Sequence, residues 1–243
     1  MAISKHSLTH KVIAPLVPRL VAKFERAIAL ASGDRTFFPL ADYPWTKDIE
    51  REWPVMQHEL RALLDQQQPR IPEFKNISSD QANITNGEWR TFMLYVYGYE
   101  VTANCAICPE TARIVKRIPG MSTALFSVLK PGANLKPHRG PYKGVLRYHL
   151  GLIVPPDHMS CGIRVGADTQ HWREGESMVF DDTHDHEAWN RSDQLRAVLF
   201  VDFVRRLPFP LDQINRTMIN LLAVSPFIQE MMTNLNDRVS DVK

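Results

Sequence analysis

The stretch PHRGPYKGVLRYHLGLIVP, residues 137–155, decides the fold because polar and apolar side chains alternate along its second half. Successive side chains of a strand point to opposite faces. One face is apolar at four positions (Leu146, Tyr148, Leu150 and Leu152). The other face carries Arg147 and His149, and Gly151 leaves room beside them. A buried guanidinium is costly unless an anion meets it. The pattern therefore predicts a strand between an apolar core and an anion.

The bulk composition sets the class of protein. The chain has 243 residues and is 44% hydrophobic, enough for one large domain or one domain with helical additions. Lys and Arg number 29 against 27 Asp and Glu, and no basic run stands out, which argues against a nucleic-acid partner. Three cysteines without a leader argue against a disulfide framework. We therefore expect a reducing, cytoplasmic compartment.

The N-terminal stretch VIAPLVPRLVAKFERAIALA, residues 12–31, is apolar but is interrupted by four charged residues. A membrane-spanning helix needs about 20 mostly apolar residues, and the stretch lacks the features of a signal peptide. We predict an amphipathic surface helix from about Leu20 and no transmembrane segment. Packing on its own domain is the favoured use of this helix, and contact with a membrane surface is the alternative.

The first third of the chain has helical periodicity. In KDIEREWPVMQHELRALLDQ, residues 47–66, apolar residues recur at helical spacing, and Pro54 is expected to divide the helix in two. We predict an N-terminal helical segment over residues 1–89 that packs on the core, a β core over 90–207 and a C-terminal helical tail over 208–243.

From Arg90 the period changes to that of strands. Six short runs are rich in β-branched and aromatic residues and are bounded by turn signals (RTFMLYVYG, TALFSVLKPG, GVLRYHLGLIV, SCGIRVG, ESMVFDD and LRAVLFVDFV). A short helix, CPETARIVKRIPG, lies between the first two. This spacing predicts a mainly β fold with flanking helices, a sandwich or barrel of the jelly-roll kind. After Pro210 the pattern is helical again, with one apolar stripe (Ile214, Met218, Leu221 and Leu222).

Histidines gather in the second half of the chain (His138, His149, His184 and His186). His138 lies at the mouth of a strand, and His186 follows another strand in FDDTHDHEAW. Two imidazoles at two strand ends are a candidate metal pair, since imidazole binds iron, zinc, copper and nickel. Non-heme iron sites usually add a carboxylate two residues after the first histidine. Here that position is Gly140, so the alternative of two surface-loop histidines stays open.

Arg196 is the second candidate for binding an anion. It begins the otherwise apolar run RAVLFVDFV, ten residues after His186. By itself it is equally well a strand-end arginine that reaches solvent. Together with Arg147 and His149 it predicts a pocket for a dicarboxylate, because arginine binds carboxylates through two hydrogen bonds.

Two further pairs of residues have weaker signals. Cys105 and Cys108 form C-x-x-C, but no further zinc ligands are in register and no thioredoxin-like unit surrounds them, so we predict small core residues. Asp181 and Asp182 either orient a metal-bound histidine or are ordinary loop acids.

Taken together, these segments resemble one family. They are FFPLADYPWTKDIEREWPVMQHELRALL, CPETARIVKRIPG, ALFSVLKPGANLKPHRGP, LRYHLGLIVP, and FDDTHDHEAW followed by Arg196. The chain resembles the aspartyl/asparaginyl β-hydroxylase family of Fe(II)- and 2-oxoglutarate-dependent oxygenases, which includes the bacterial lipid A fatty-acyl hydroxylases. The resemblance extends over most of the chain. The joint spacing of its histidines and arginines is specific, although no single segment is.

The resemblance implies a double-stranded β-helix, a cupin-like jelly roll, with Fe(II), 2-oxoglutarate and O₂ as cofactor and co-substrates. It implies that His138 and His186 bind the iron. Four residues match those around the co-substrate (Ser127, Arg147, His149 and Arg196). In the family, Ser127 and Arg196 correspond to the residues that hold the distal carboxylate. Arg147 and His149 correspond to residues near the other carboxylate and near the substrate acid. No further catalytic residue is implied.

The resemblance leaves the substrate open. Gly140 matches the aspartyl enzymes, whereas the lipid A hydroxylases have Asp there. Val145 replaces an arginine that the aspartyl enzymes use for the substrate carboxylate, so here the sequence is closer to the lipid branch. We expect hydroxylation of an unactivated carbon, foremost the β-carbon of an aspartyl, asparaginyl or related residue in a small molecule, a peptide or a carrier-bound amino acid. The alternatives are a lipid A acyl hydroxylase at the inner membrane surface and a non-catalytic jelly-roll binding module.

Overall fold

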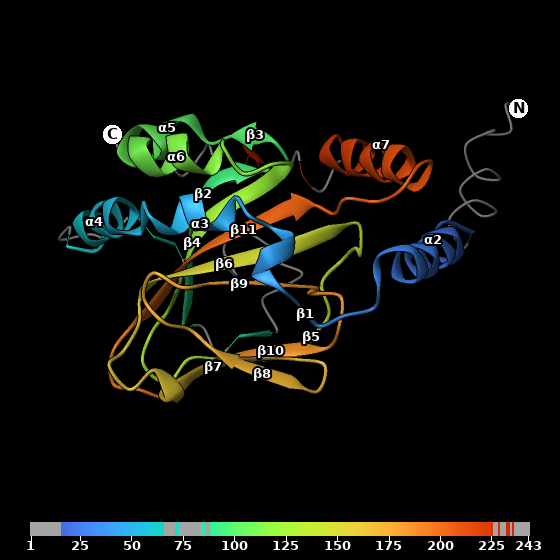
Figure 1. Cartoon of the computed structure of the whole chain (residues 1–243). Coiled ribbons are helices and arrows are strands. Elements are labelled where there is room, and N and C mark those ends of the chain that lie inside the picture. Colours follow the sequence, from blue (N-terminus) through green and yellow to red (C-terminus); the bar gives the residue numbers. More distant parts are fainter. Residues whose placement is uncertain are drawn as a thin grey trace, which may run out of the picture.

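Three layers make up the protein. The computed structural model describes residues 16–65, 71–72, 84–85, 88–225, 228, 232–233 and 235. Figure 1 shows helices on one side of a seven-stranded sheet and a four-stranded sheet on its other side. All strand pairs of both sheets are antiparallel.

The larger sheet has the order β1-β9-β6-β11-β4-β2-β3. Its strands are β1 (Phe37–Phe38), β2 (Trp89–Val96), β3 (Tyr99–Glu100), β4 (Met121–Leu129), β6 (Val145–Ile153), β9 (Ser177–Phe180) and β11 (Arg196–Val204). The smaller sheet has the order β5-β10-β7-β8. Its strands are β5 (Asn134–His138), β7 (Cys161–Val165), β8 (Asp168–His171) and β10 (His186–Asn190).

From β4 to β11 the chain passes back and forth between the two sheets, which is the jelly-roll arrangement. This confirms the predicted mainly β, cupin-like fold, and each of the six predicted runs forms a strand. The strands that the sequence did not predict are β1, β3, β5, β8 and β10, all between two and five residues long. The predicted divisions at residues 89 and 207 stay predictions.

The helices are α2 (Leu16–Ser32), α3 (Thr46–Glu50), α4 (Trp53–Leu64), α5 (Thr102–Ile107), α6 (Pro109–Val115) and α7 (Leu211–Ala223), with 3-10 turns at Leu40–Asp42 and His158–Ser160. The division at Pro54 is confirmed: this proline lies in the first turn of α4, where its missing N–H costs nothing. Helix α2 begins earlier than the predicted Leu20, and α5 was not predicted.

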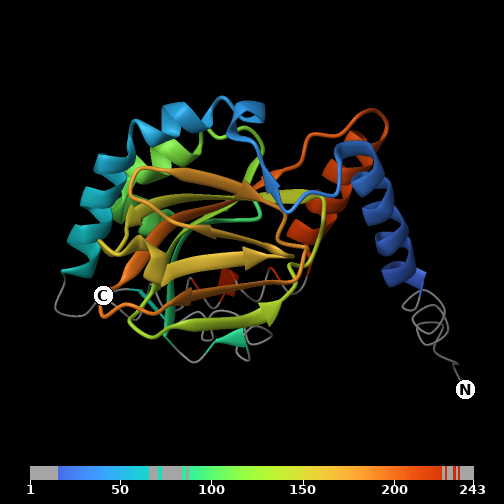
Figure 2. The same ribbon diagram turned by 60° about the horizontal axis from the view of Figure 1, so that its bottom comes forward.

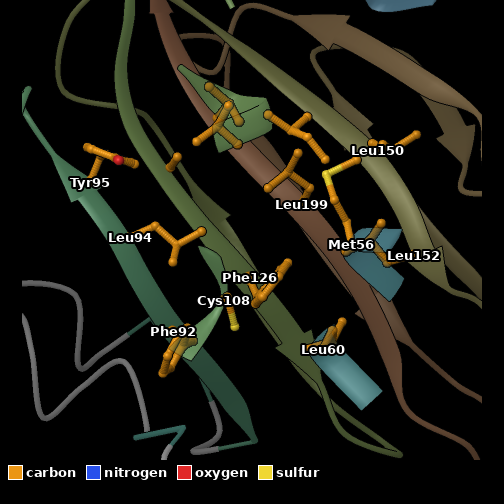
Figure 3. Packing of buried hydrophobic residues seen from close by; sticks show 14 of the residues in the cluster. Met56, Leu60, Phe92, Leu94, Tyr95, Cys108, Phe126, Leu150, Leu152 and Leu199 are labelled. Atoms are coloured by element: carbon orange, nitrogen blue, oxygen red, sulfur yellow. The ribbon is translucent and has the colours of Figure 1, made fainter. Parts of the chain in front are cut away.

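The apolar face of β6 packs under the helices. Leu146, Tyr148, Leu150 and Leu152 are all buried in a cluster between α4, α6 and the seven-stranded sheet, as predicted. Figure 3 shows Met56 and Leu60 of α4 in this cluster, with Met56 next to Leu150 and Leu152 of β6. Cys105 and Cys108 are buried there as free thiols, which confirms them as core residues.

The opposite face of the same strands points into the space between the two sheets. A second apolar cluster fills most of this space and includes Leu125 of β4, Phe200 of β11 and Ile163 of β7. Arg147 and His149 lie on this inner face, as predicted. The candidate site therefore lies inside the β-sandwich, on the other side of the larger sheet from the helices.

Helix α7 forms where the sequence predicts a helix, but most of its apolar stripe faces outward. The residues that α7 buries are Asn215 and Ile219, whereas Ile214 and Leu221 are exposed. The reason is a polar anchor: the Asn215 side chain donates to the carbonyl of Gly144 over 2.8 Å and accepts from the hydroxyl of Tyr142 over 2.8 Å. These contacts attach α7 to the loop before β6 and turn the apolar stripe outward.

Asp181 is the buried centre of an ion-pair network under α2. Its carboxylate accepts from the ammonium of Lys143 over 2.7 Å, from Arg205 and from the backbone N–H of Thr183 over 3.0 Å. Burial alone would raise the pKa of Asp181, but Arg205 and Lys143 hold this pKa below its ordinary value. The network fixes the segment that leads to His186.

Asp34 and His184 lie beside Asp181, so that one ligand atom of each is within 4.8 Å of the others. This group does not have the character of a cation site, because the Lys143 ammonium lies 2.8 Å from Asp34 and Arg205 pairs with Asp181. Two protein cations already neutralise its carboxylates.

We predict that Asp181→Asn lowers the free energy of unfolding by about 3–5 kcal/mol, because it leaves two buried cations without their shared carboxylate. Asp193→Asn, at an exposed loop position, is the matched control and should change the free energy by less than about 0.5 kcal/mol. Urea denaturation followed by circular dichroism measures both. Equal effects of the two substitutions would contradict the role of the network.

The same pair of variants gives a pH dependence. Since the folded pKa of Asp181 is lowered, its contribution is fully present above the unfolded pKa of about 3.9 and is lost as pH falls through the folded pKa. The difference in the free energy of unfolding between the wild type and Asp181→Asn should therefore become smaller below about pH 4.

Candidate active site

The inner faces of the strands bring the six predicted site residues into one narrow recess. Its lining includes Ser127 of β4, His138 of β5, Arg147 and His149 of β6, His186 of β10 and Arg196 of β11. The recess holds about 30 Å³. Residues from both sheets meet here although the sequence separates them by up to 69 positions.

His138 and His186 face each other across paired strands. They are direct partners in the register of β5 and β10, and their ring centroids are 4.1 Å apart. The Nδ1 of His138 lies 2.7 Å from the carbonyl oxygen of Lys136, and that of His186 lies 3.0 Å from the carbonyl oxygen of His184. A carbonyl only accepts, so each Nδ1 carries the proton and each Nε2 keeps its lone pair.

Burial keeps both imidazoles neutral. It lowers the pKa of His138, and burial together with the nearby His138 lowers the pKa of His186 to about 3. Neutral imidazole is the form that binds a metal ion. The pair thus has the tautomer and the charge that metal ligands need, and its role as such stays a prediction.

Arg196 is buried and has no carboxylate partner among the residues that the structure describes. Its Nη1 donates to the carbonyl of Ser127 over 3.2 Å, its Nε has no hydrogen-bond partner, and its guanidinium lies 4.3 Å from the ring centroid of Trp172. Burial lowers the pKa of Arg196 to about 9, so the group is still charged at neutral pH. A buried, uncompensated charge of this kind requires an anion.

His149 and Ser127 add two neutral donors to the recess. Trp172 Nε1 donates to His149 Nδ1 over 3.3 Å, so the proton of the neutral ring is on Nε2, which is buried and has no partner. Burial, with Arg147 and Arg196 nearby, lowers the pKa of His149 well below its ordinary value. Ser127 Oγ accepts from Trp89 Nε1 over 3.0 Å, so its own proton is free to donate.

Arg147 differs from Arg196 because it is already neutralised. Its Nε and Nη2 bind the Asp202 carboxylate over 2.8 and 3.2 Å, and Nη2 lies 2.8 Å from Asp182. Burial opposes the charged form, but the two carboxylates raise the pKa of Arg147 above its ordinary value. The guanidinium stacks on the ring of Phe200, 4.1 Å from its centroid. Its predicted contact with the co-substrate or the substrate acid stays a prediction.

Asp182 occupies the space of the missing side chain at Gly140. A Cβ built at Gly140 would lie 2.1 Å from Asp182 Oδ2, and the backbone N–H of Gly140 donates to the carbonyl of Asp182 over 2.7 Å. Burial raises the pKa of Asp182 to about 6. The site therefore has a carboxylate beside its histidines, supplied by residue 182 and not by residue 140.

Two tryptophans of the recess, Trp89 and Trp172, were not predicted as site residues. No pattern separated them from core residues, because their roles depend on hydrogen bonds to Ser127 and His149 that only the packed sheets create.

A wider pocket of about 400 Å³ continues outward from the recess and shares His138, Arg147 and His186 with it. Most of its wall is apolar or aromatic (Trp89, Met93, Val96, Tyr97, Leu125, Phe200, Leu222 and Ile228). The arrangement is that of a polar inner end for an anion, a histidine pair at the junction and an apolar outer chamber.

The sequence profile described as Aspartyl/Asparaginyl beta-hydroxylase matches residues 50–206, more than half of the chain and all six site residues. The chain belongs to the aspartyl/asparaginyl β-hydroxylase family. The family resemblance inferred from the motifs is thereby confirmed, and the relatives named below are hydroxylases.

One relative is an ornithine lipid ester-linked acyl 2-hydroxylase from Rhizobium tropici, 43% identical over 203 residues, which are 83% of this chain and 72% of that protein. The human aspartyl/asparaginyl beta-hydroxylase is 30% identical over 162 residues, 64% of this chain but 20% of that protein. Among solved structures, a cupin domain of an Enterobacter cloacae transcriptional regulator is 13% identical and covers 49% of this chain and 99% of that domain, with a TM-score of 0.35.

We predict that His138→Ala and His186→Ala each abolish stoichiometric binding of Fe(II), because each removes one of two facing Nε2 ligands. His58→Ala, on the exposed face of α4, is the control and should bind iron as the wild type does. Equilibrium dialysis under anaerobic conditions, followed by metal analysis, measures the stoichiometry. Full iron binding by both site variants would contradict the assignment.

Proposed function

We propose that this protein is an Fe(II)- and 2-oxoglutarate-dependent dioxygenase that hydroxylates the acyl chain of a membrane lipid. The observation that carries the proposal is the buried Arg196. It has no carboxylate partner in the described part of the chain and lies in a recess that joins a neutral histidine pair to an apolar pocket.

The residues present fit an iron ion. His138 and His186 would hold it through their Nε2 atoms, since backbone carbonyls fix both Nδ1 protons. A ligand set of two imidazoles leaves positions for a bidentate co-substrate and for O₂. Asp182, packed on Gly140, provides a nearby carboxylate that can accept a hydrogen bond from a water molecule in the pocket.

The residues also fit a dicarboxylate. Arg196 would pair with its distal carboxylate, and the hydroxyl of Ser127 would donate to the same group. The unpartnered Nε2–H of His149 offers a further donor. Because the recess is narrow, it accepts the carboxylate end of a linear anion and leaves the other end toward the histidine pair.

When bound, iron with 2-oxoglutarate and O₂ supplies the oxidation, in which one oxygen atom enters a C–H bond of the substrate and the other enters succinate, with release of CO₂. The protein orients these groups. Trp172 fixes the tautomer of His149 and stacks on Arg196, and the apolar wall of the outer pocket excludes water from the substrate carbon.

The charges of the outer pocket favour an acyl chain over an acidic substrate. Two arginines line the described part of this pocket, and both are paired: Arg147 with Asp182 and Asp202, and Arg139 with Glu25 over 2.7 Å. Val145 stands where the aspartyl enzymes have a further arginine. A substrate carboxylate would thus find no free cation here, whereas an alkyl chain would meet the apolar wall.

The rhizobial relative, named for hydroxylation at position 2 of an ester-linked acyl chain, supports the same choice. An aspartyl or asparaginyl substrate, which Gly140 favours, stays the alternative prediction. The two substrate classes are separated by the product assay described below.

We predict that Arg196→Met raises the KM for 2-oxoglutarate by about tenfold to a hundredfold, the loss of one or more charge-assisted hydrogen bonds. Arg191→Met removes an exposed arginine that stacks on Trp189 and should leave this KM unchanged. Succinate formation at varied 2-oxoglutarate measures both. An unchanged KM in Arg196→Met would contradict the proposed anion site.

The proposed reaction is tested by mass spectrometry of the products. The protein, Fe(II) and 2-oxoglutarate are incubated with vesicles that contain an ester-linked acyl lipid such as ornithine lipid, or with an aspartyl peptide. We expect one added oxygen on the acyl chain, none on the peptide and none with His186→Ala. Hydroxylation of the peptide alone would contradict the lipid substrate.

A further inference from the structure

The outer pocket lies near two helices, α2 and α7, that carry exposed apolar side chains. Leu222 at the end of α7, followed by Ser225 and Ile228, lines the pocket. Arg139 also lines it and pairs with Glu25 of α2. Helix α7 therefore borders the pocket and α2 contacts a residue of its lining, and Figures 1 and 2 show the two helices at the same end of the molecule.

Exposed apolar side chains are concentrated at this end. Ten large hydrophobic residues are exposed in the part of the chain that the structure describes, and seven of them lie on α2, on α7 or directly before or after α7. Leu221 is 64% exposed and Val224 62%, next to the Leu222 of the pocket wall. On α2, Leu20 and Leu30 are exposed in the same way. Such a concentration marks an interaction surface.

Free positive charge accompanies these side chains. Arg19, Lys23 and Arg26 follow one another along the exposed side of α2, and none has an ion-pair partner among the described residues. The acids of the two helices are already matched, Glu25 by Arg139 and Asp212 by Arg216. The surface therefore presents apolar side chains together with unmatched cations.

This combination fits one partner, an anionic lipid bilayer. Apolar side chains of an amphipathic helix enter the boundary between headgroups and acyl chains, and Lys and Arg bind the anionic headgroups. A second copy of this chain fits less well, because a symmetric contact would place the basic side of α2 against itself. No helix in the described part of the chain is long and apolar enough to span a membrane, so the contact would be made at the surface.

We propose that the exposed faces of α2 and α7 dock the protein on an anionic membrane, with the outer pocket open toward the bilayer. The inference rests on the proposed lipid substrate and adds a route for it: an acyl chain would enter between the helices without crossing water. Asn215 fixes the position of α7 relative to the pocket, because its side chain is hydrogen-bonded to Tyr142 and Gly144 in the loop at the pocket rim.

The test is sedimentation of the full-length protein, without iron or 2-oxoglutarate, with two kinds of vesicle. One kind contains phosphatidylcholine alone, and the other also contains phosphatidylglycerol. We expect binding to the second kind, weakened about fivefold for each charge removed in Lys23→Gln and Arg26→Gln and reduced at high salt.

The double variant Leu221→Asp/Val224→Asp should lower the vesicle affinity by about tenfold or more, because two apolar side chains no longer enter the bilayer. Met159→Asp, at an equally exposed apolar residue of the 3-10 turn His158–Ser160, is the control and should bind as the wild type does. Equal binding of the double variant and the wild type would overturn the proposal. The proposal would also be overturned if the wild type formed a dimer and bound no vesicles, and if the double variant were a monomer.

The two proposals fail in different ways. Loss of vesicle binding with intact binding of Fe(II) and 2-oxoglutarate would contradict the docking surface alone. Vesicle binding without binding of Fe(II) and 2-oxoglutarate would contradict the proposed chemistry and leave the surface in place.

Discussion

The site depends on how a β-sandwich accommodates buried positive charge. Arg147 and Arg196 both point into the space between the sheets, where an unpaired guanidinium is costly. The fold solves the problem for Arg147 with two of its own carboxylates. Because one of them is Asp182, the ion pair also fixes the segment before β10 and with it His186. Arg196 receives no such partner, so its charge is left for a ligand.

This difference between two arginines defines the polarity of the whole pocket. The inner end has a free guanidinium and two free neutral donors, and the outer chamber has matched charges in an apolar wall. A bound dicarboxylate would neutralise Arg196 at the inner end, as Asp182 and Asp202 neutralise Arg147. In the proposed function the outer chamber would select its substrate by shape and apolar contact, and the exposed apolar residues of α7 beside it extend that apolar character to the surface.

Much of the fold and of the inner site could be predicted from the sequence, because polar and apolar side chains alternate regularly along β6. The alternation from Leu146 to Leu152 gave the strand, its apolar side and its polar side. The short strands β5 and β10 escaped prediction because polar residues and a proline leave no clear apolar alternation there, with Lys136, Pro137 and His138 in β5 and His186, Glu187 and Asn190 in β10. The orientation of α7 could not be predicted because it depends on Asn215, whose partners lie 71 and 73 positions away. Nothing local distinguishes Arg147 from Arg196, since Asp202 is 55 positions from its partner. The glycine at position 140 did mark a place where no side chain fits, but the carboxylate that fills this place is that of Asp182, from another segment.

The most direct test of this account is an anaerobic titration of the purified protein with Fe(II) and 2-oxoglutarate, followed in the visible range. Chelation of the iron by 2-oxoglutarate at the histidine pair produces a charge-transfer band. The account predicts that the band appears in the wild type, is lost in His186→Ala and requires far more 2-oxoglutarate in Arg196→Ala. A well-folded wild-type protein that shows no band would contradict it and would leave a jelly-roll binding module as the better description.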